Sequence, residues 1–158
     1  MTERDWNTQA RNRAERLLRA KPLADGKQVA PSDIKALLEA VIEPADRVCL
    51  EGNNQKQADF LARTLTSVDP GRVHDLHMVQ SVLALPEHLD VFERGIAAKL
   101  DFSFSGPQSG RLARLAGAGQ INIGAIHTYL ELFARYFVDL TPRVSLIPPQ
   151  AADAAGNP

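Results

Sequence analysis

Short apolar runs alternate with amphipathic segments along most of this chain. The runs at 48–50, 73–79, 100–104, 121–123 and 143–147 predict buried strands. Apolar residues that recur at a spacing of three and four predict helices over 6–20, 33–42, 55–67, 86–96, 128–136 and around 112–116. Because strands alternate with helices from residue 47 onward, the pattern predicts an α/β fold with a mainly parallel sheet and helices on both faces.

The amino-terminal third differs from the rest in that its pattern predicts helices without strands. Residues 1–45 form a helical extension in which Ser32 is expected to cap the second helix, and residues 46–158 form a first α/β domain. The last predicted strand is followed by only eleven residues. This ending fits either a domain with a loose tail or a longer protein that has been cut.

One strand-to-turn-to-helix segment stands out as a candidate site. The strand over 48–50 leads into Gly52, Asn53 and Asn54, residue types that allow tight turns and cap helices, and the predicted helix then starts at Gln55. In parallel sheets, ligands bind at the carboxyl ends of strands, and helix N-termini attract anions. The segment lacks the second glycine of a phosphate-binding P-loop, so an ordinary strand-to-helix connection remains an equal alternative.

A second loop has the same layout. Gly106, Pro107 and Gln108 follow the strand over 100–104 and precede a helix. Two such loops at one sheet edge would offer backbone N–H groups to an acyl oxygen or a phosphate. Ser105 stands outside the Gly-x-Ser-x-Gly pattern of serine hydrolases, which argues against that chemistry.

Three histidines are weighed for site roles. His127 follows a strand, where it either orients a ligand or forms a hydrogen bond that orders the turn, and Glu131 lies one helical turn beyond it. His74 and His77 are three residues apart and would face opposite sides of a strand. We therefore expect no metal site.

Composition narrows the possible functions. The 158 residues are 44% hydrophobic and 23% charged, with a net charge of −1, which gives no field that favours nucleic acid or membrane. No segment approaches a membrane span, and the single cysteine, Cys49, lies in an apolar strand. These features predict a cytoplasmic protein.

The first predicted helix has two contrasting faces. A modest apolar stripe lies opposite four arginines: Arg11, Arg13, Arg16 and Arg19. The arginine face is either simply solvated or a docking surface for an acidic partner.

Four segments together resemble the α subunits of malonate decarboxylases. They are LEGNNQKQADFL at 50–61, VHDLHMVQS at 73–81, FSFSGPQ at 102–108 and GAIHTYLE at 124–131. The resemblance covers about residues 46–157. More distantly, the layout is similar to the amino-terminal domain of family I coenzyme A transferases.

The resemblance implies an acyl exchange on an acyl carrier protein. Malonate displaces acetate from the carrier thioester, and other malonate decarboxylase subunits then decarboxylate the malonyl group. The carrier's prosthetic arm derives from dephospho-coenzyme A, and no cofactor is expected to bind this chain directly. The residues implied in binding substrate or the arm are Gly52, Asn53, Asn54, Gln55, Gly106, Pro107, Gln108 and His127.

The chain also departs from that family. Its members are several times longer, and the catalytic glutamate of family I transferases lies in the second half, so it is expected outside this chain and is not assigned to Glu51. We therefore expect an inactive fragment. Two alternatives remain open: a non-catalytic domain that docks a carrier or partner subunit, and a coenzyme A thioester hydrolase.

Overall fold

The fold is built on a parallel sheet. The computed structural model describes residues 6–51, 58–149 and 151–153. Within them the sheet has five strands in the order β4-β3-β2-β1-β5, and every neighbouring pair is parallel. The strands are β1 (Arg47–Leu50), β2 (Leu76–Val82), β3 (Ala97–Phe104), β4 (Asn122–Ile126) and β5 (Val144–Leu146).

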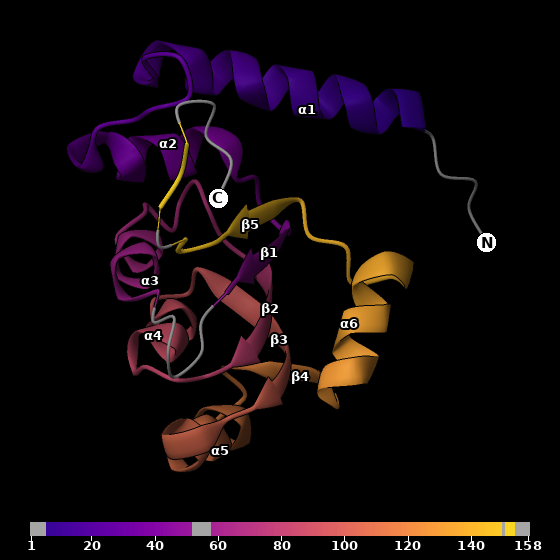
Figure 1. Ribbon diagram of the computed structural model, residues 1–158. Helices are drawn as coiled ribbons and strands as arrows, with labels where there is room; N and C mark the ends of the chain where they lie inside the picture. Colours follow the sequence, from indigo (N-terminus) through magenta and orange to yellow (C-terminus); the bar gives the residue numbers. More distant parts are fainter. Residues whose placement is uncertain (1–5, 52–57, 150, 154–158) are drawn as a thin grey trace.

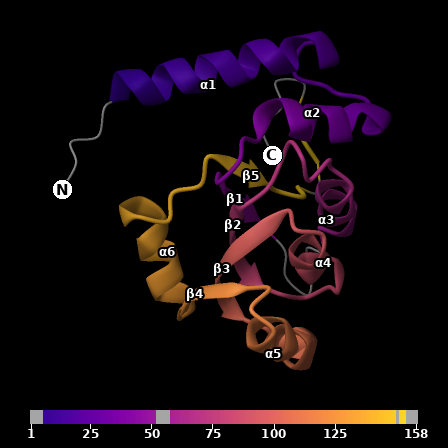
Figure 2. The same cartoon turned by 180° about the vertical axis from the view of Figure 1, so that it is seen from behind.

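Helices cover both faces of this sheet, as predicted, but unequally. Figures 1 and 2 show α3, α4 and α5 on one face and α6 by itself on the other. The α-helices are α1 (Trp6–Ala20), α2 (Ile34–Val41), α3 (Asp59–Thr66), α4 (Glu87–Glu93), α5 (Ser109–Gly117) and α6 (Tyr129–Val138). Three single turns of 3-10 helix add to them: η1 (Lys21–Leu23), η2 (Pro31–Asp33) and η3 (Gly106–Gln108).

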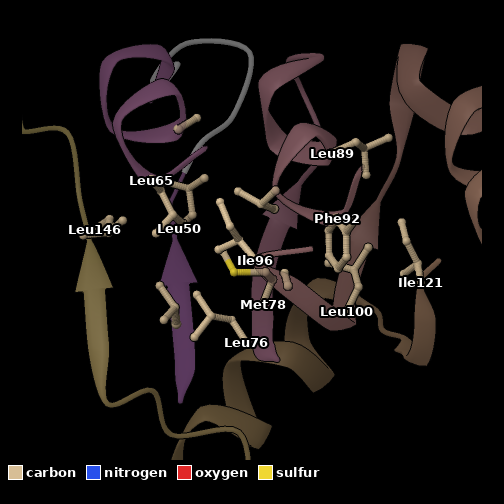
Figure 3. Close-up of a cluster of buried hydrophobic side chains, with 14 of the residues drawn as sticks. Leu50, Leu65, Leu76, Met78, Leu89, Phe92, Ile96, Leu100, Ile121 and Leu146 are labelled. Atoms are coloured by element: carbon tan, nitrogen blue, oxygen red, sulfur yellow. The ribbon is translucent and has the colours of Figure 1, made fainter. Parts of the chain in front are cut away.

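The main core lies between the sheet and the larger helical layer (Figure 3). In β2, Leu76 and Met78 point into this core, and Val79 points to the opposite face, where it meets Leu132 and Leu140. The main core includes Leu38 from α2. The second helix therefore packs with the α/β domain, and the domain boundary after residue 45 stays a prediction.

Several details of the sequence prediction were wrong. The helix predicted over 86–96 ends at Glu93, and the strand predicted over 100–104 begins three residues earlier, at Ala97. The strand predicted over 73–79 starts three residues later, because residues before Leu76 form a turn in which Asp75 has a left-handed φ of 57°. Buried Val73 gives that turn the apolar character of a strand. Ser32 does not cap α2; it lies within η2, and the capping position belongs to Asp33, which makes no side-chain capping bond.

The first helix is attached by its polar side. Arg16 donates to Glu43 at 2.8 Å and pairs with buried Asp46, and Arg19 donates to the backbone oxygen of Ala40 at 2.7 Å. Leu17 and Leu18 are exposed instead. The expectation of four solvent-facing arginines was therefore wrong for Arg16, whereas Arg19 remains exposed; both residues hold α1 against the end of α2.

Arg11 and Arg13 remain exposed on α1, as the sequence predicted. Figure 1 shows the helix lying across one end of the molecule, beside α2. Among the described helices, none is both long enough and apolar enough to cross a bilayer.

Candidate functional site

Predicted site segments follow the carboxyl ends of strands in the sheet. Because all strands are parallel, β1, β3 and β4 end at the same edge, where Glu51, Ser105 and His127 follow them. The backbone N–H of Glu51 donates to Leu146 and extends the pairing of β1 with β5. Gly52, Asn53, Asn54 and Gln55 lie outside the described residues, so their predicted role stays a prediction.

The Gly106 loop forms a tight turn between β3 and α5. Gly106 has a left-handed φ of +50°, and a Cβ there would lie 3.2 Å from Cε1 of Phe104. The N–H groups of Gln108 and Ser109 bond the carbonyls of Ser105 and Gly106 within the turn. The groups of this loop that could bind a ligand are therefore the backbone N–H of Gly106 and the half-buried side chain of Gln108.

Two serine hydroxyls brace this turn. Ser109 Oγ donates to the Gly106 carbonyl at 2.6 Å and lies 2.8 Å from Ser105 Oγ. Since a hydroxyl has a single proton, Ser105 is the donor in the pair. Its proton is thus committed to another serine rather than to a base, an arrangement unlike that of an activated nucleophile.

An apolar cavity of about 330 Å³ adjoins the loop. Its lining comes from β3, β4 and α5, and exposed Phe104 and Ile126 are among its walls. The other lining residues are Phe102, Ser103, Ser105, Ser109, Leu112, Ala113, Ala116 and Ile123. Sequence analysis missed this cavity, because only the tertiary structure brings α5 and β4 together.

A buried carboxylate joins three neighbouring segments on the opposite face of the sheet. Asp101 of β3 bonds His77 of β2 at 2.6 Å and His127, just after β4, at 2.7 Å. The Nε2 atom of each histidine faces Asp101. This cluster of Asp101, His77 and His127, here called the carboxylate cluster, ties the end of β4 to the middle of the sheet.

The proton positions in the carboxylate cluster follow from its neighbours. Arg47 Nε lies 3.4 Å from Nδ1 of His77, so Nδ1 accepts and the Nε2–H donates to Asp101. Burial lowers the pKa of His77, and the nearby Asp101 only partly offsets this effect. Burial raises the pKa of Asp101, but hydrogen bonds from His127 and His77 outweigh burial, so the pKa is lowered overall.

A missing side chain makes room for the carboxylate cluster. A Cβ on Gly124 would lie 2.1 Å from Oδ2 of Asp101. The register passes from Leu100 opposite Ile123 to Asp101 opposite Ala125, so Gly124 is the extra residue of a bulge. Sequence analysis missed Asp101; a carboxylate inside the apolar run at 100–104 was the available signal.

The histidine predictions have different outcomes. His127 has a fully buried side chain, which favours the turn-ordering alternative, and contact with a ligand stays a prediction. A carboxylate oxygen of Glu131 lies 3.2 Å from Nδ1 of His127 without forming a hydrogen bond, so the predicted proximity is confirmed.

His74 pairs with exposed Asp75, away from the His77–Asp101 contact. The described residues hold no metal-binding group of three or more histidine, cysteine or acidic side chains.

The lone cysteine lies under α6. Cys49 Sγ is 3.4 Å from the hydroxyl of Tyr136, and burial raises the pKa of the thiol to about 11. The thiol is thus buried, as expected for a cysteine in an apolar strand, and its raised pKa makes it poorly reactive.

We expect Asp101→Asn to destabilise the fold by about 3 kcal/mol, since one amide oxygen replaces a charged acceptor shared by two imidazoles. Urea unfolding at neutral pH measures this. Asp75→Asn, at a side chain that is 69% exposed, is the control and should cost less than about 1 kcal/mol.

The pKa of Asp101 is depressed on folding, so the stability that its carboxylate contributes is present at neutral pH and is lost as the pH falls below about 4. A difference between wild type and variant that stays constant as the pH falls well below about 4 would contradict the assignment.

Gly106→Ala should destabilise the protein by about 1–2 kcal/mol, because alanine is strained at this φ and its methyl group meets the Phe104 ring. The matched control is Gly117→Ala, at a helical position with open space around the added atom. That variant should be neutral or stabilising by up to about 1 kcal/mol in the same unfolding measurement. Equal effects at the two positions would refute the strained-turn explanation.

Comparison with known proteins identifies the relatives of this chain. The family described as "Malonate decarboxylase, alpha subunit, transporter" matches residues 5–158. A protein of Malonomonas rubra named acetyl-S-ACP:malonate ACP transferase is 53% identical over 156 residues, which are 98% of this chain and 28% of that protein.

Solved structures agree with this sequence match. A Pseudomonas malonate decarboxylase hetero-tetramer in complex with malonate matches with a TM-score of 0.86 and 56% identity, over 91% of this chain and 26% of the matched chain. The malonate decarboxylase alpha subunit of Acinetobacter baumannii matches with a TM-score of 0.85 and 50% identity, over 90% and 26% of the two chains. This chain thus spans about a quarter of the length of these relatives, and it belongs to the malonate decarboxylase alpha-subunit family.

Proposed function

We propose that this chain is the amino-terminal quarter of a subunit that transfers an acyl carrier protein from acetate to malonate. In this reaction the thioester bond to the acetyl group breaks, a thioester bond to malonate forms, and acetate leaves. The observation that carries the proposal is the 53% identity, over almost the whole chain, to a relative named for this transfer.

The cavity beside the Gly106 loop supports a binding role for this quarter. Its phenylalanine, leucine and isoleucine walls suit the apolar stretches of a flexible arm, such as the dephospho-coenzyme A-derived arm that we propose for the carrier. Gly106 N–H and the Gln108 side chain, in the loop between the lining residues Ser105 and Ser109, would donate hydrogen bonds to the thioester oxygen. Pro107 fixes the start of the turn between them.

Under this proposal, other parts of the subunit and other proteins supply the catalytic groups. The catalytic glutamate would lie in the remainder of the subunit, so the 158 residues contribute binding and positioning. The partners would be the acyl carrier protein and the other malonate decarboxylase subunits, in the cytoplasm. The reaction as proposed exchanges one carboxylate for another on a thioester, and it requires no redox change.

The full-length subunit should move isotope-labelled malonate onto acetyl carrier protein, and the 158-residue chain alone should not. Gln108→Ala in the full-length subunit should lower the rate about a hundredfold, because one donor to the thioester oxygen is lost. Gln120→Ala, an exposed position beyond α5, is the matched control and should retain wild-type exchange.

Three results of this assay would redirect the proposal. Exchange by the isolated chain would refute its inactivity. Wild-type exchange in Gln108→Ala would remove that side chain from the site. Release of free carrier thiol without any need for malonate would identify a thioester hydrolase instead.

Docking of the carrier is a second candidate role, and the surface of α1 favours it. Arg11 and Arg13 are exposed on a helix whose Leu17 and Leu18 are also exposed. Exposed cations beside apolar side chains suit an acidic partner that also offers apolar contacts, and carrier proteins are commonly acidic. Arg16 and Arg19 are excluded from this surface, because they bind Glu43 and Asp46 within the chain.

The double variant R11E/R13E should weaken carrier binding by about tenfold or more, measured by calorimetry, and the weakening should diminish at high salt. R11K/R13K keeps both charges and is the control for helix structure. Unchanged affinity in R11E/R13E would discard α1 as the docking surface, and equal losses in both variants would point to helix disruption.

A further inference from the structure

The outward side of α6 is apolar over its whole length. Tyr129, Leu130, Phe133 and Phe137, here called the outer stripe, are 60%, 79%, 62% and 70% exposed. The rings of Phe133 and Phe137 pack edge to face with centroids 5.2 Å apart. A continuous patch of large apolar side chains on one helix is the signature of a surface that another structure covers.

The charged residues of α6 are occupied with one another. Arg135 lies 4.0 Å from Glu131 and donates from Nε to Asp139 at 2.5 Å, so these three residues, spaced by four, form a chain of ion pairs. These ion pairs leave a net charge of only −1 on the helix, and the outer stripe itself carries no charged side chain. The matching surface is therefore apolar, as in permanent interfaces rather than in transient, electrostatically guided ones.

The sheet itself indicates that a layer is incomplete here. Parallel sheets are covered on both faces, and in Figures 1 and 2 α6 is alone on its face, opposite α3, α4 and α5. The inward side of α6 is anchored by Leu132 and Tyr136, against Val79 and Cys49. The helix thus has two apolar sides, the arrangement of a helix that lies inside a larger structure.

We propose that the outer stripe of α6 is the docking face for the remainder of the same subunit, the three quarters of the relatives' length that lie outside these 158 residues. The proposal rests on the proposed function, in which this chain is one part of a longer polypeptide. The relatives supply the length: this chain covers 28% and 26% of two of them. A permanent apolar contact on a sheet-covering helix is what one chain forms with itself, since the layers of a domain share a core.

Phe133→Cys provides the test, through its reaction rate with N-ethylmaleimide relative to the same protein in concentrated urea. The rate is measured in the 158-residue chain, in the isolated full-length subunit and in the assembled complex, with modified peptides resolved by mass spectrometry. Native Cys49 gives little background, because it is buried and its thiol pKa is raised to about 11. Arg94→Cys, on the exposed end of α4, is the control for reagent access.

We expect fast labelling of Phe133→Cys in the 158-residue chain and labelling at least about tenfold slower in the isolated full-length subunit, at every protein concentration. Fast labelling in the isolated subunit with protection only in the complex would overturn the proposal in favour of a different subunit. Protection of the 158-residue chain that grows with its concentration would overturn it in favour of a second copy. Fast labelling in all three preparations, or a natural protein of only 158 residues, would also overturn it.

A second position keeps the test informative if Phe133→Cys disturbs folding. Leu130→Cys replaces the most exposed member of the outer stripe and should follow the same pattern. The labelling does not depend on turnover. A protected stripe in a subunit without acyl exchange would refute the proposed function and leave the docking face, whereas an exposed stripe in an active subunit would do the reverse.

Discussion

A parallel sheet requires cover on both of its faces, and the rest of this structure follows from how the chain meets that requirement. On one face, α3, α4 and α5 and the residues around them bury a large apolar core that includes Leu65, Phe92 and Leu112. On the other face α6 contributes a small cluster with Val79, Leu132 and Leu140. Because one ten-residue helix covers a limited area, the same face also carries polar side chains that need partners of their own.

The carboxylate cluster provides hydrogen-bond partners for the polar side chains on this face. A buried carboxylate contributes stability only when donors surround it, and Asp101 obtains them from a strand on one side and from the turn before α6 on the other. Its position also demands a glycine at residue 124, since any side chain there would meet the carboxylate. We regard the cluster as a device that fixes the register of β3 and β4, which line the apolar cavity, and the starting direction of α6.

Two helices present surfaces of opposite kinds. The first helix, α1, is held through arginine and carboxylate contacts and leaves Arg11 and Arg13 exposed, whereas α6 is held through apolar contacts and exposes further apolar residues. Charged surfaces favour rapid, salt-dependent association, and apolar ones favour lasting contact. The function proposed above would use both kinds of surface, the charged one for a carrier protein that comes and goes and the apolar one for the remainder of the subunit.

Periodicity along the sequence determined most of the elements and the parallel α/β class, because apolar spacing and turn residues are local properties. It also located the Gly106 turn and placed His127 after a strand. The tertiary structure alone decided that Arg16 faces Asp46, that α1 exposes Leu17, and that Val73 belongs to a turn, since these outcomes depend on which distant groups lie nearby. The carboxylate cluster and the cavity could not be predicted from the sequence either, because both are assembled from neighbouring strands. The order of the strands in the sheet, β4-β3-β2-β1-β5, is set by packing between segments far apart in the chain.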